Sequence, residues 1–422
     1  MEAWLAFGKT GIVANLPDRF RYSILEARSA KPLPDEAGAI EDALDHPIGC
    51  QPIREMAAGR GSAAISVCDI TRPAPNRRVL PPLLRRLEES GVPRSGIVIL
   101  IATGLHRPAT EAEIGEIVGE EIASGYRVEN HYARDPDQHR YLGTTAKGTP
   151  VYIDRRFVDA DLHITLGFIE PHLMLGFSGG RKLIVPGLAG QETIKAIHSP
   201  KFMREPRAVE GCVDGNPLHA ELLEIAGMAR HDFMVDVALT RERRIAAVFA
   251  GEPRAAHQAG VAMVSNLLLE RLDEPVDAVV TTAAGYPLDL TFYQSLKGVT
   301  AASHIVKPGG RILLAAACEE GPGAAEFSRM LKEHPSGEAF LRHIENAPVV
   351  VDQWQLEKLA LVTRDKQVLF YTPGLPAEYH ANLWGPIFPT LEQAVAGLTD
   401  GLPPGARIAV IPEGPYVLAK VS

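Results

Sequence analysis

Short apolar runs alternate with longer segments in which apolar residues recur at helical spacing, a pattern typical of α/β proteins. The first series of predicted strands covers residues 63–68, 97–102 and 162–166, with helical patterns at 80–90 and 110–119. Thr110 and Glu113 carry the spacing of a capping box, which places a helix start at Thr110. Residues 233–239 and 245–249 flank the polar segment TRERR and predict a hairpin.

The composition shifts near residues 272–276, where a second α/β series begins. Its predicted elements are strands at 278–282, 311–315, 349–351 and 368–371, a helix at 294–302, and a turn at 308–310. We therefore predict two α/β domains, an N-terminal cofactor-binding domain at 1–272 and a C-terminal domain at 273–422. The strand at 408–411 is compatible with either domain. Polar residues that could carry chemistry cluster where the predicted strands end, so we expect the active site in the cleft between the domains.

Composition narrows the class of protein. The chain has 422 residues, of which 46% are hydrophobic and 23% charged, as in ordinary globular proteins. A net charge of −9, with basic residues only in pairs, argues against nucleic acid as a partner. Four scattered cysteines form no CxxC pair, and no apolar stretch approaches the roughly 20 residues of a membrane span. The N-terminus does not resemble a signal peptide, so we predict a cytoplasmic enzyme without membrane contact.

The most informative stretch is EPHLMLGFSGGRKLIVPGLAGQETIKAIHSP at 170–200. Its turn, Ser178-Gly179-Gly180-Arg181-Lys182, brings backbone amides and basic groups together, which suits a phosphate or a covalently held cofactor. An ordinary tight turn with basic neighbours is the alternative interpretation. The apolar surroundings of Lys182 favour the cofactor, because desolvation makes a lysine a better nucleophile.

Three further groups are candidates for chemistry. His106, His172 and His198 lie at or beside predicted active-site loops, although their spacing matches no zinc motif and single histidines are often structural. Asp69 and Arg72, in DITRP, follow a strand; they suit anion binding, or equally an Asp-Thr cap with a surface arginine. Tyr293, Gln294 and Lys297 would share a helix that could bind a carboxylate, or form an ordinary amphipathic helix with a solvated lysine.

Taken together, these motifs resemble the nickel-dependent lactate racemase family over nearly the whole chain. The resemblance runs through GKTGIVANLPD, DITRP, ATGLHRP, EPHLMLGFSGGRK, the His198 segment, FYQSLKG and DQWQ. Each motif alone is weak, but their order and spacing together are specific. The resemblance implies a racemase or epimerase of a small 2-hydroxy acid. It also implies a nickel-pincer nucleotide, a pyridinium mononucleotide with two sulfur donors, which cofactor-synthesis enzymes supply.

The resemblance also implies a role for each matching residue. Lys182 would attach covalently to the cofactor, with Asp69 and the turn at 178–181 beside it, and His198 would ligate nickel. His106 and His172 would be the two acid/base groups. The residues around the substrate and its carboxylate would be Arg72, Tyr293, Gln294, Lys297 and Trp354.

Other functions remain open from sequence alone. Within the same chemistry, the substrate could be lactate, malate, an aryl lactate or a sugar acid, because the side-chain pocket cannot be aligned. A nicotinamide-dependent oxidoreductase is a different class, but the chain lacks a GxGxxG motif in the required strand–helix context. A non-catalytic nucleotide- or metal-binding protein is a third possibility, and it leaves the paired His106 and His172 unexplained.

Overall fold

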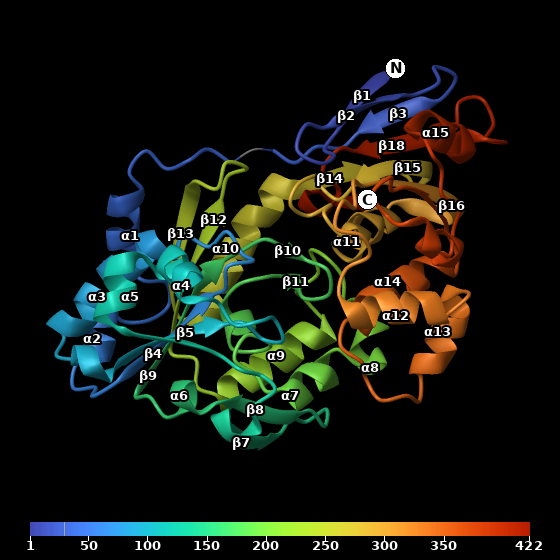
Figure 1. The fold of residues 1–422 in the computed structure, drawn as a ribbon. Coiled ribbons are helices and arrows are strands. Elements are labelled where there is room, and N and C mark those ends of the chain that lie inside the picture. The colour runs from blue at the N-terminus through green and yellow to red at the C-terminus, as the bar shows by residue number, and fades with distance from the viewer. Residues whose placement is uncertain (29) are drawn as a thin grey trace. The chain divides into compact units, whose positions relative to one another are not determined.

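The computed structural model describes residues 1–28 and 30–422, and its contacts divide the chain into two compact units. The central unit comprises Ser29–Ile197 and Cys212–Leu267, and the terminal unit comprises Met1–Arg28, His198–Gly211 and Leu268–Ser422. Both units contain helices and a mainly parallel sheet (Figure 1), which confirms the predicted α/β class. The division differs from a single boundary at 272/273, because residues 1–28 and 198–211 join the C-terminal part.

The central unit is built on a six-stranded sheet in the order β13-β12-β9-β4-β5-β6. Its strands are parallel except for the β12–β13 hairpin, which was predicted from sequence and is confirmed. The strands of this unit are β4 (Ala63–Cys68), β5 (Ile97–Ala102), β6 (Arg127–Asn130), β7 (His139–Thr144), β8 (Pro150–Asp154), β9 (Leu162–Phe168), β10 (Pro171–His172), β11 (Gly176–Phe177), β12 (Phe233–Leu239) and β13 (Ile245–Gly251).

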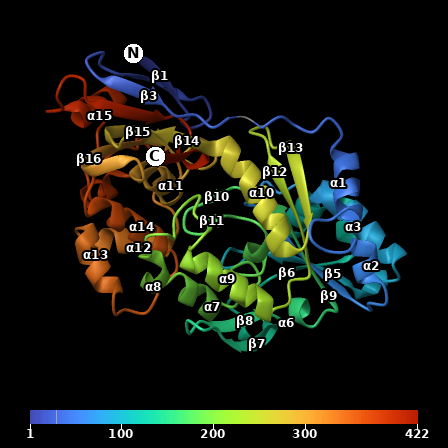
Figure 2. The ribbon, with the colours of Figure 1, turned by 180° about the vertical axis from the view of Figure 1, so that it is seen from behind.

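Helices cover both faces of this sheet, as its continuously buried strands require. The helices are α1 (Glu36–Asp45), α2 (Ile53–Ala57), α3 (Asn76–Glu89), α4 (Glu111–Val118), α5 (Glu120–Gly125), α6 (Arg155–Val158), α7 (Gln191–Ile197), α9 (Pro217–Met228) and α10 (Pro253–Leu268). The predicted capping box of α4 is confirmed, since Thr110 and Glu113 cap each other's backbone amides. Figure 2 shows α10 along β12 and β13, where Gly260 faces the ring of Phe249.

The terminal unit contains a parallel five-stranded sheet in the order β17-β16-β15-β18-β3. Its strands are β1 (Glu2–Leu5), β2 (Ile12–Asn15), β3 (Arg21–Ile24), β14 (Leu269–Leu272), β15 (Val276–Thr282), β16 (Val306–Ala315), β17 (Gln367–Tyr371), β18 (Arg407–Ile411) and β19 (Leu418–Val421). Its helices are α8 (Pro200–Met203), α11 (Phe292–Ser303), α12 (Ala325–Glu333), α13 (Gly337–Ile344), α14 (Gln353–Thr363) and α15 (Leu391–Thr399). The strand left open in the sequence, at 408–411, lies in this sheet.

Two local predictions for this unit are wrong. The expected turn at 308–310 lies inside β16, because the register against β15 shifts there and the extra residues bulge within the strand. Residues 349–351 form no strand. The Gln353 side chain instead accepts a hydrogen bond from the Val350 amide at 2.7 Å, so this apolar segment leads into α14.

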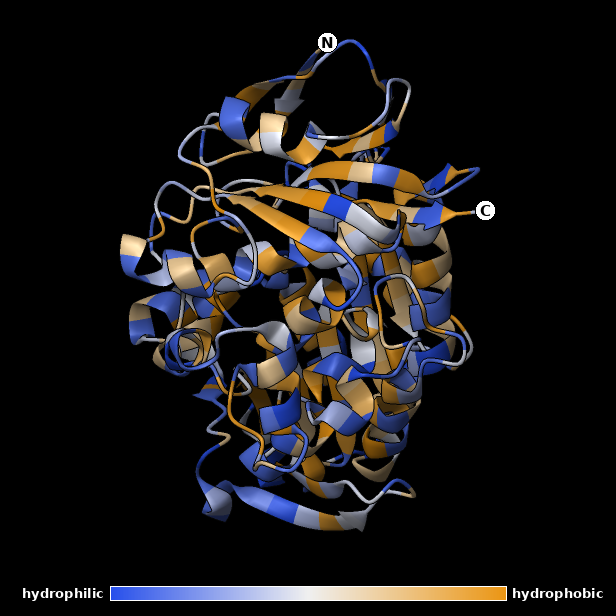
Figure 3. Cartoon of the chain, turned by 90° about the vertical axis from the view of Figure 1, so that its right-hand side faces the viewer, coloured by the Kyte–Doolittle hydropathy of each residue, from blue (hydrophilic) through white to orange (hydrophobic). Residues whose placement is uncertain are grey.

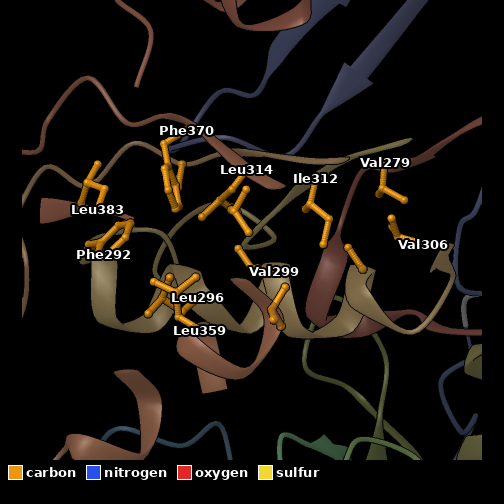
Figure 4. Packing of buried hydrophobic residues seen from close by; sticks show 14 of the residues in the cluster. Val279, Phe292, Leu296, Val299, Val306, Ile312, Leu314, Leu359, Phe370 and Leu383 are labelled. Carbon is orange, nitrogen blue, oxygen red and sulfur yellow. The ribbon is translucent and has the colours of Figure 1, made fainter. Parts of the chain in front are cut away.

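Each unit has its own apolar core, and in Figure 3 hydrophobic residues concentrate on the strands. In the terminal unit, Phe292, Leu296 and Val299 lie on one face of α11 and point toward the sheet (Figure 4). Leu359 of α14 joins the same cluster. This packing fixes the orientation of α11 and α14, which carry several of the candidate residues. No helix among the described residues is long and apolar enough to cross a membrane.

Candidate functional site

Asp69 and His106 lie at neighbouring carboxyl ends of the central sheet. Asp69 directly follows β4, the His106 loop follows β5, and Cys68 pairs with Ala102 where the two strands end. The Nδ1 atom of His106 is 2.7 Å from Oδ2 of Asp69. Thr71 donates its hydroxyl proton to Oδ1 of the same carboxylate at 2.6 Å. The parallel register therefore assembles an aspartate–histidine pair from two loops.

The charge state of this pair follows from its surroundings. Burial alone would raise the pKa of Asp69, but hydrogen bonds from His106 and Thr71 and the nearby charge of Arg72 keep that pKa below its usual value. Asp69 is 6% exposed, whereas the His106 side chain is 51% exposed. An ionised Asp69 accepts a hydrogen bond from Nδ1–H of His106, so in the neutral ring Nε2 carries no proton and is the available base.

His172 follows β9 in the chain, and β9 pairs with β4 on the side opposite to β5. His172 pairs with Gly176 in the small β10–β11 hairpin and is half-buried. Its Nδ1 accepts a hydrogen bond from the Met174 amide at 3.5 Å, which puts the proton of the neutral ring on Nε2. For Nε2 to act as a base, the ring would have to give up this long hydrogen bond. His106 and His172 thus present different tautomers, the first as an acceptor and the second as a donor.

The glycine turn is held by the protein itself. The Ser178 hydroxyl donates to the Phe168 carbonyl and accepts from the Glu170 amide, both at 2.9 Å. Gly179 and Gly180 have φ values of 87° and 47°, which favour glycine. The Gly180 amide donates to Oδ2 of Asp236 at 2.8 Å. The Gly180 amide is therefore already paired with a carboxyl group of the protein.

The side chain of Arg181 is also hydrogen-bonded within the protein. It is 2% exposed and donates to the backbone carbonyls of Leu175, Phe177, Ser178 and Gly179, with the His257 ring nitrogen 2.6 Å away. Burial lowers the pKa of Arg181 to about 9, and the charge of Asp236 partly opposes this shift. A guanidinium enclosed in this way fixes the turn.

Lys182 follows this turn in a short 3-10 helix, Gly180–Leu183, and is half-buried. Its amide donates to the Gly179 carbonyl at 3.1 Å. Its charge reaches the buried thiol of Cys68, whose pKa burial raises well above the usual value. The 3-10 helix that carries the lysine contacts β4, because the Ser66 hydroxyl donates to the Leu183 carbonyl at 2.8 Å.

In the terminal unit, the predicted helix with Tyr293, Gln294 and Lys297 is confirmed as α11. Thr291 caps its start by accepting from the Gln294 amide at 3.4 Å. Tyr293 and Lys297 lie one turn apart, and the Tyr293 hydroxyl accepts from Nε1 of Trp354 at 3.2 Å. The buried Oε1 of Gln294 has no hydrogen-bond partner among the described residues. Such an amide oxygen is suited to a ligand hydroxyl.

His198 is the first residue of the terminal unit after α7. Its ring lies 4.3 Å from that of Trp354, centroid to centroid, with an interplanar angle of 39°. Trp354 thus contacts both His198 and Tyr293, which brings three candidates together. No group of three or more His, Cys, Asp or Glu side chains within the described ranges could hold a metal ion. A metal bound through His198 would therefore need donors from a non-protein group.

The structure distributes the predicted residues over both units. The central unit carries Asp69, Arg72, His106, His172, Ser178, Gly179, Gly180, Arg181 and Lys182, and the terminal unit carries His198, Tyr293, Gln294, Lys297 and Trp354. Sequence reasoning missed Asp236, although a single acidic residue in the apolar run FMVDVAL was a visible signal. It also missed Glu357 and Lys358 of α14, which are buried polar residues.

Two family models together match most of the chain. Residues 7–211 match the family model of the lactate racemase N-terminal domain, and residues 272–419 match that of the lactate racemase C-terminal domain. The lactate racemase of Thermoanaerobacterium thermosaccharolyticum is 32% identical over 421 residues, 99% of this chain and 98% of the relative. That of Lactiplantibacillus plantarum is 34% identical over 389 residues, 91% of each chain.

Two solved structures resemble the whole fold. The lactate racemase apoprotein from T. thermosaccharolyticum superposes with a TM-score of 0.93 at 32% identity and covers 100% of both chains. A protein from Thermotoga maritima gives a TM-score of 0.68 at 18% identity, covering 93% of this chain and 100% of the other. The second likeness concerns the fold alone.

Proposed function

Because the chain belongs to the lactate racemase family, we propose that it is an isomerase that interconverts the two enantiomers of lactate or a related 2-hydroxy acid. The observation that carries this proposal is the pair of Asp69 and His106, with 2.7 Å between carboxylate and ring nitrogen. Inverting the carbon that carries the hydroxyl group requires a base for the hydroxyl proton. His106 Nε2 accepts that proton, and Asp69 stabilises the resulting imidazolium.

His172 is the second acid/base group in this proposal. To give a proton to the substrate oxygen, His172 must be an imidazolium with protons on both Nδ1 and Nε2, so it must release the Met174 amide hydrogen bond to Nδ1. Acting as the base for the opposite enantiomer requires its Nδ1 to become a donor. The long hydrogen bond from the Met174 amide is weak enough to be exchanged for water. The two histidines would then alternate between base and acid in the two directions.

The substrate would be held through its charge. Arg72 offers a two-pronged donor and Lys297 a point charge, which together fix a carboxylate. The buried Oε1 of Gln294, which has no partner among the described residues, would accept a hydrogen bond from a donor group of the bound ligand other than the hydroxyl that gives its proton to the histidine base. Tyr293 and Trp354 would form the adjoining wall, since they hold each other by a hydrogen bond.

The family resemblance implies a nickel-pincer nucleotide, which when bound would supply a reversible hydride acceptor and so allow passage through a planar 2-keto acid. The donor set of this chain fits such a group. His198 would contribute one imidazole, and the remaining nickel ligands would come from the nucleotide, which agrees with the lack of a multi-residue metal cluster among the described side chains. Lys182 would hold the nucleotide covalently, while Ser178–Arg181 fix the turn that presents this lysine.

Racemisation itself is the first test. Protein produced together with cofactor-synthesis enzymes is incubated with each enantiomer of lactate, malate, an aryl lactate and a sugar acid, and the opposite hand is measured. We expect at least one of these acids to racemise, with loss of activity in His106→Ala and unchanged activity in the exposed control His46→Ala. Nicotinamide-dependent oxidation without racemisation would instead support the oxidoreductase alternative.

The cofactor is tested separately from activity. Peptide mapping should find an adduct on Lys182 that is lost in Lys182→Ala and kept in the exposed control Lys31→Ala. His198→Ala should lose nickel while it retains the circular dichroism of the wild type. An unmodified Lys182 in active protein, or full nickel content in His198→Ala, would contradict the assigned roles.

A further inference from the structure

One face of α14 contacts several points of the segment at 198–211. In sequence the segment lies between α7 and α9 of the central unit, yet it belongs to the terminal unit. Its contacts with α14 involve Trp354, Glu357 and Lys358. The last two lie three and four residues after Trp354, so both share a helix face with it. Trp354 contacts the ring of His198, as described above.

Lys358 ties two points of the segment together. Its side chain is buried, and Nζ donates to the carbonyls of Met203 at 3.0 Å and Ala208 at 2.7 Å. Burial lowers the pKa of Lys358, and the charges of Glu210 and Glu357 partly oppose the shift. One ammonium group thus holds the loop that follows α8.

Carboxylates secure other points of the same segment. Glu357, which is fully buried, accepts from Nε of Arg204 at 3.0 Å, and Arg204 also donates to the Leu341 carbonyl at 2.8 Å. Glu210, near the end of the segment, accepts from the Thr300 hydroxyl at 2.9 Å and has the His304 ring nitrogen at the same distance. The segment is therefore fixed along its length.

We propose that Lys358 and Glu357 are positioning residues that hold His198 in the orientation its metal role requires, an inference that rests on the proposed function. Burying an ammonium and a carboxylate costs free energy that an apolar pair of the same size would avoid. The charged pair fixes the orientation of the segment, because its hydrogen bonds go to particular carbonyl and guanidinium groups of the segment. An apolar replacement could fill the same volume without fixing these groups.

Fluorescence of Trp354 measures this positioning without any cofactor. Of the three tryptophans, Trp4 and Trp384 are changed to phenylalanine in the full chain, so that Trp354 alone emits. Trp354 is 8% exposed in the structure. In Lys358→Met we expect the acrylamide quenching constant to rise by about twofold or more as the segment loosens. Lys358→Arg should restore much of the protection, and the exposed control Lys332→Met should match the parent.

The outcomes separate this inference from the proposed function. An unchanged quenching constant in a folded Lys358→Met variant would overturn the inference, whatever the reaction. Should Lys358→Met fail to fold, Glu357→Gln carries the same test, because it removes the charge that holds Arg204 of the segment; a rise in the quenching constant is expected, and no change would overturn the inference. In the cofactor-loaded protein, Lys358→Met should lose nickel; if quenching rises while nickel stays bound, the segment does not position a metal ligand.

Discussion

Asp236 is a buried carboxyl group whose ionisation should oppose folding of the central unit. It lies on β12 with no exposed surface; Oδ2 accepts from the Gly180 amide at 2.8 Å, while Oδ1 has no hydrogen-bond partner among the described residues. Burial raises the pKa of Asp236 from 3.8 to about 7, against the opposing effects of the Gly180 amide and the Arg181 charge. We therefore take Asp236→Asn as the perturbation, since the amide keeps an oxygen acceptor and cannot ionise.

The magnitude follows from the pKa difference between the folded and unfolded chain. A carboxyl group whose folded pKa is raised contributes its full stability below the unfolded pKa of 3.8 and loses it as the pH rises toward about 7. A shift of about three pKa units corresponds to about 4 kcal/mol. The advantage of Asp236→Asn over the wild type in unfolding free energy should therefore grow by about 4 kcal/mol between pH ~4 and pH ~8.

The assay must report on the central unit, because all three tryptophans lie in the terminal unit. Hydrogen exchange of peptides from β9 and β12, measured by mass spectrometry across the pH range and corrected for intrinsic exchange, gives the local unfolding free energy. The exposed control Asp137→Asn should run parallel to the wild type. A constant difference between Asp236→Asn and wild type at all pH values would refute the reasoning, since it would mean that the group ionises equally easily in both states.

Three further outcomes follow from packing and from the aspartate–histidine pair. A methyl group on Gly298 of α11 would lie 2.2 Å from a backbone carbonyl of β15, so Gly298→Ala should lower the melting temperature and cost about 1–3 kcal/mol of unfolding free energy. The control Gly227→Ala is at an exposed helix position with open space. In the same melts it should be neutral or stabilising by about 0.5–1 kcal/mol. Leu296→Ala should cost about 2–5 kcal/mol in urea unfolding followed by tryptophan fluorescence; a smaller loss would mean that the core collapses around the cavity. Asp69→Asn should lower kcat for racemisation by about 10²-fold with cofactor content unchanged, because His106 loses its charged partner; wild-type kcat would exclude Asp69 from orienting the base.

Much of the fold could be predicted because local patterns and burial agree. The strands at 63–68 and 97–102 are apolar throughout and have the predicted bounds, and Thr110 caps its helix as its spacing indicated. The turn expected at 308–310 fails because two glycines can also form a bulge inside a strand whose partner holds it in place. A local pattern does not distinguish these outcomes.

Some contacts of the candidate site could likewise be predicted from the sequence, and others could not. The pairing of Asp69 with His106 follows from neighbouring parallel strand ends, a geometry that the sequence could suggest. The partner of the Gly180 amide could not be predicted, because Asp236 is distant in sequence and reaches the turn only through sheet order. Lys358 was missed for a related reason, since its two carbonyl partners carry no side-chain signal.

The order of the terminal sheet has a consequence for the chain during its synthesis. Strand β3 pairs with β18, with Arg21 opposite Arg407, so one of the first strands to leave the ribosome finds its neighbour only when nearly the whole chain has been made. Ser29–Ile197, by contrast, already contains four of the six strands of the central sheet. This topology therefore allows the central sheet to begin forming before β3 can pair, because the partner of β3 is made only with residues 407–411.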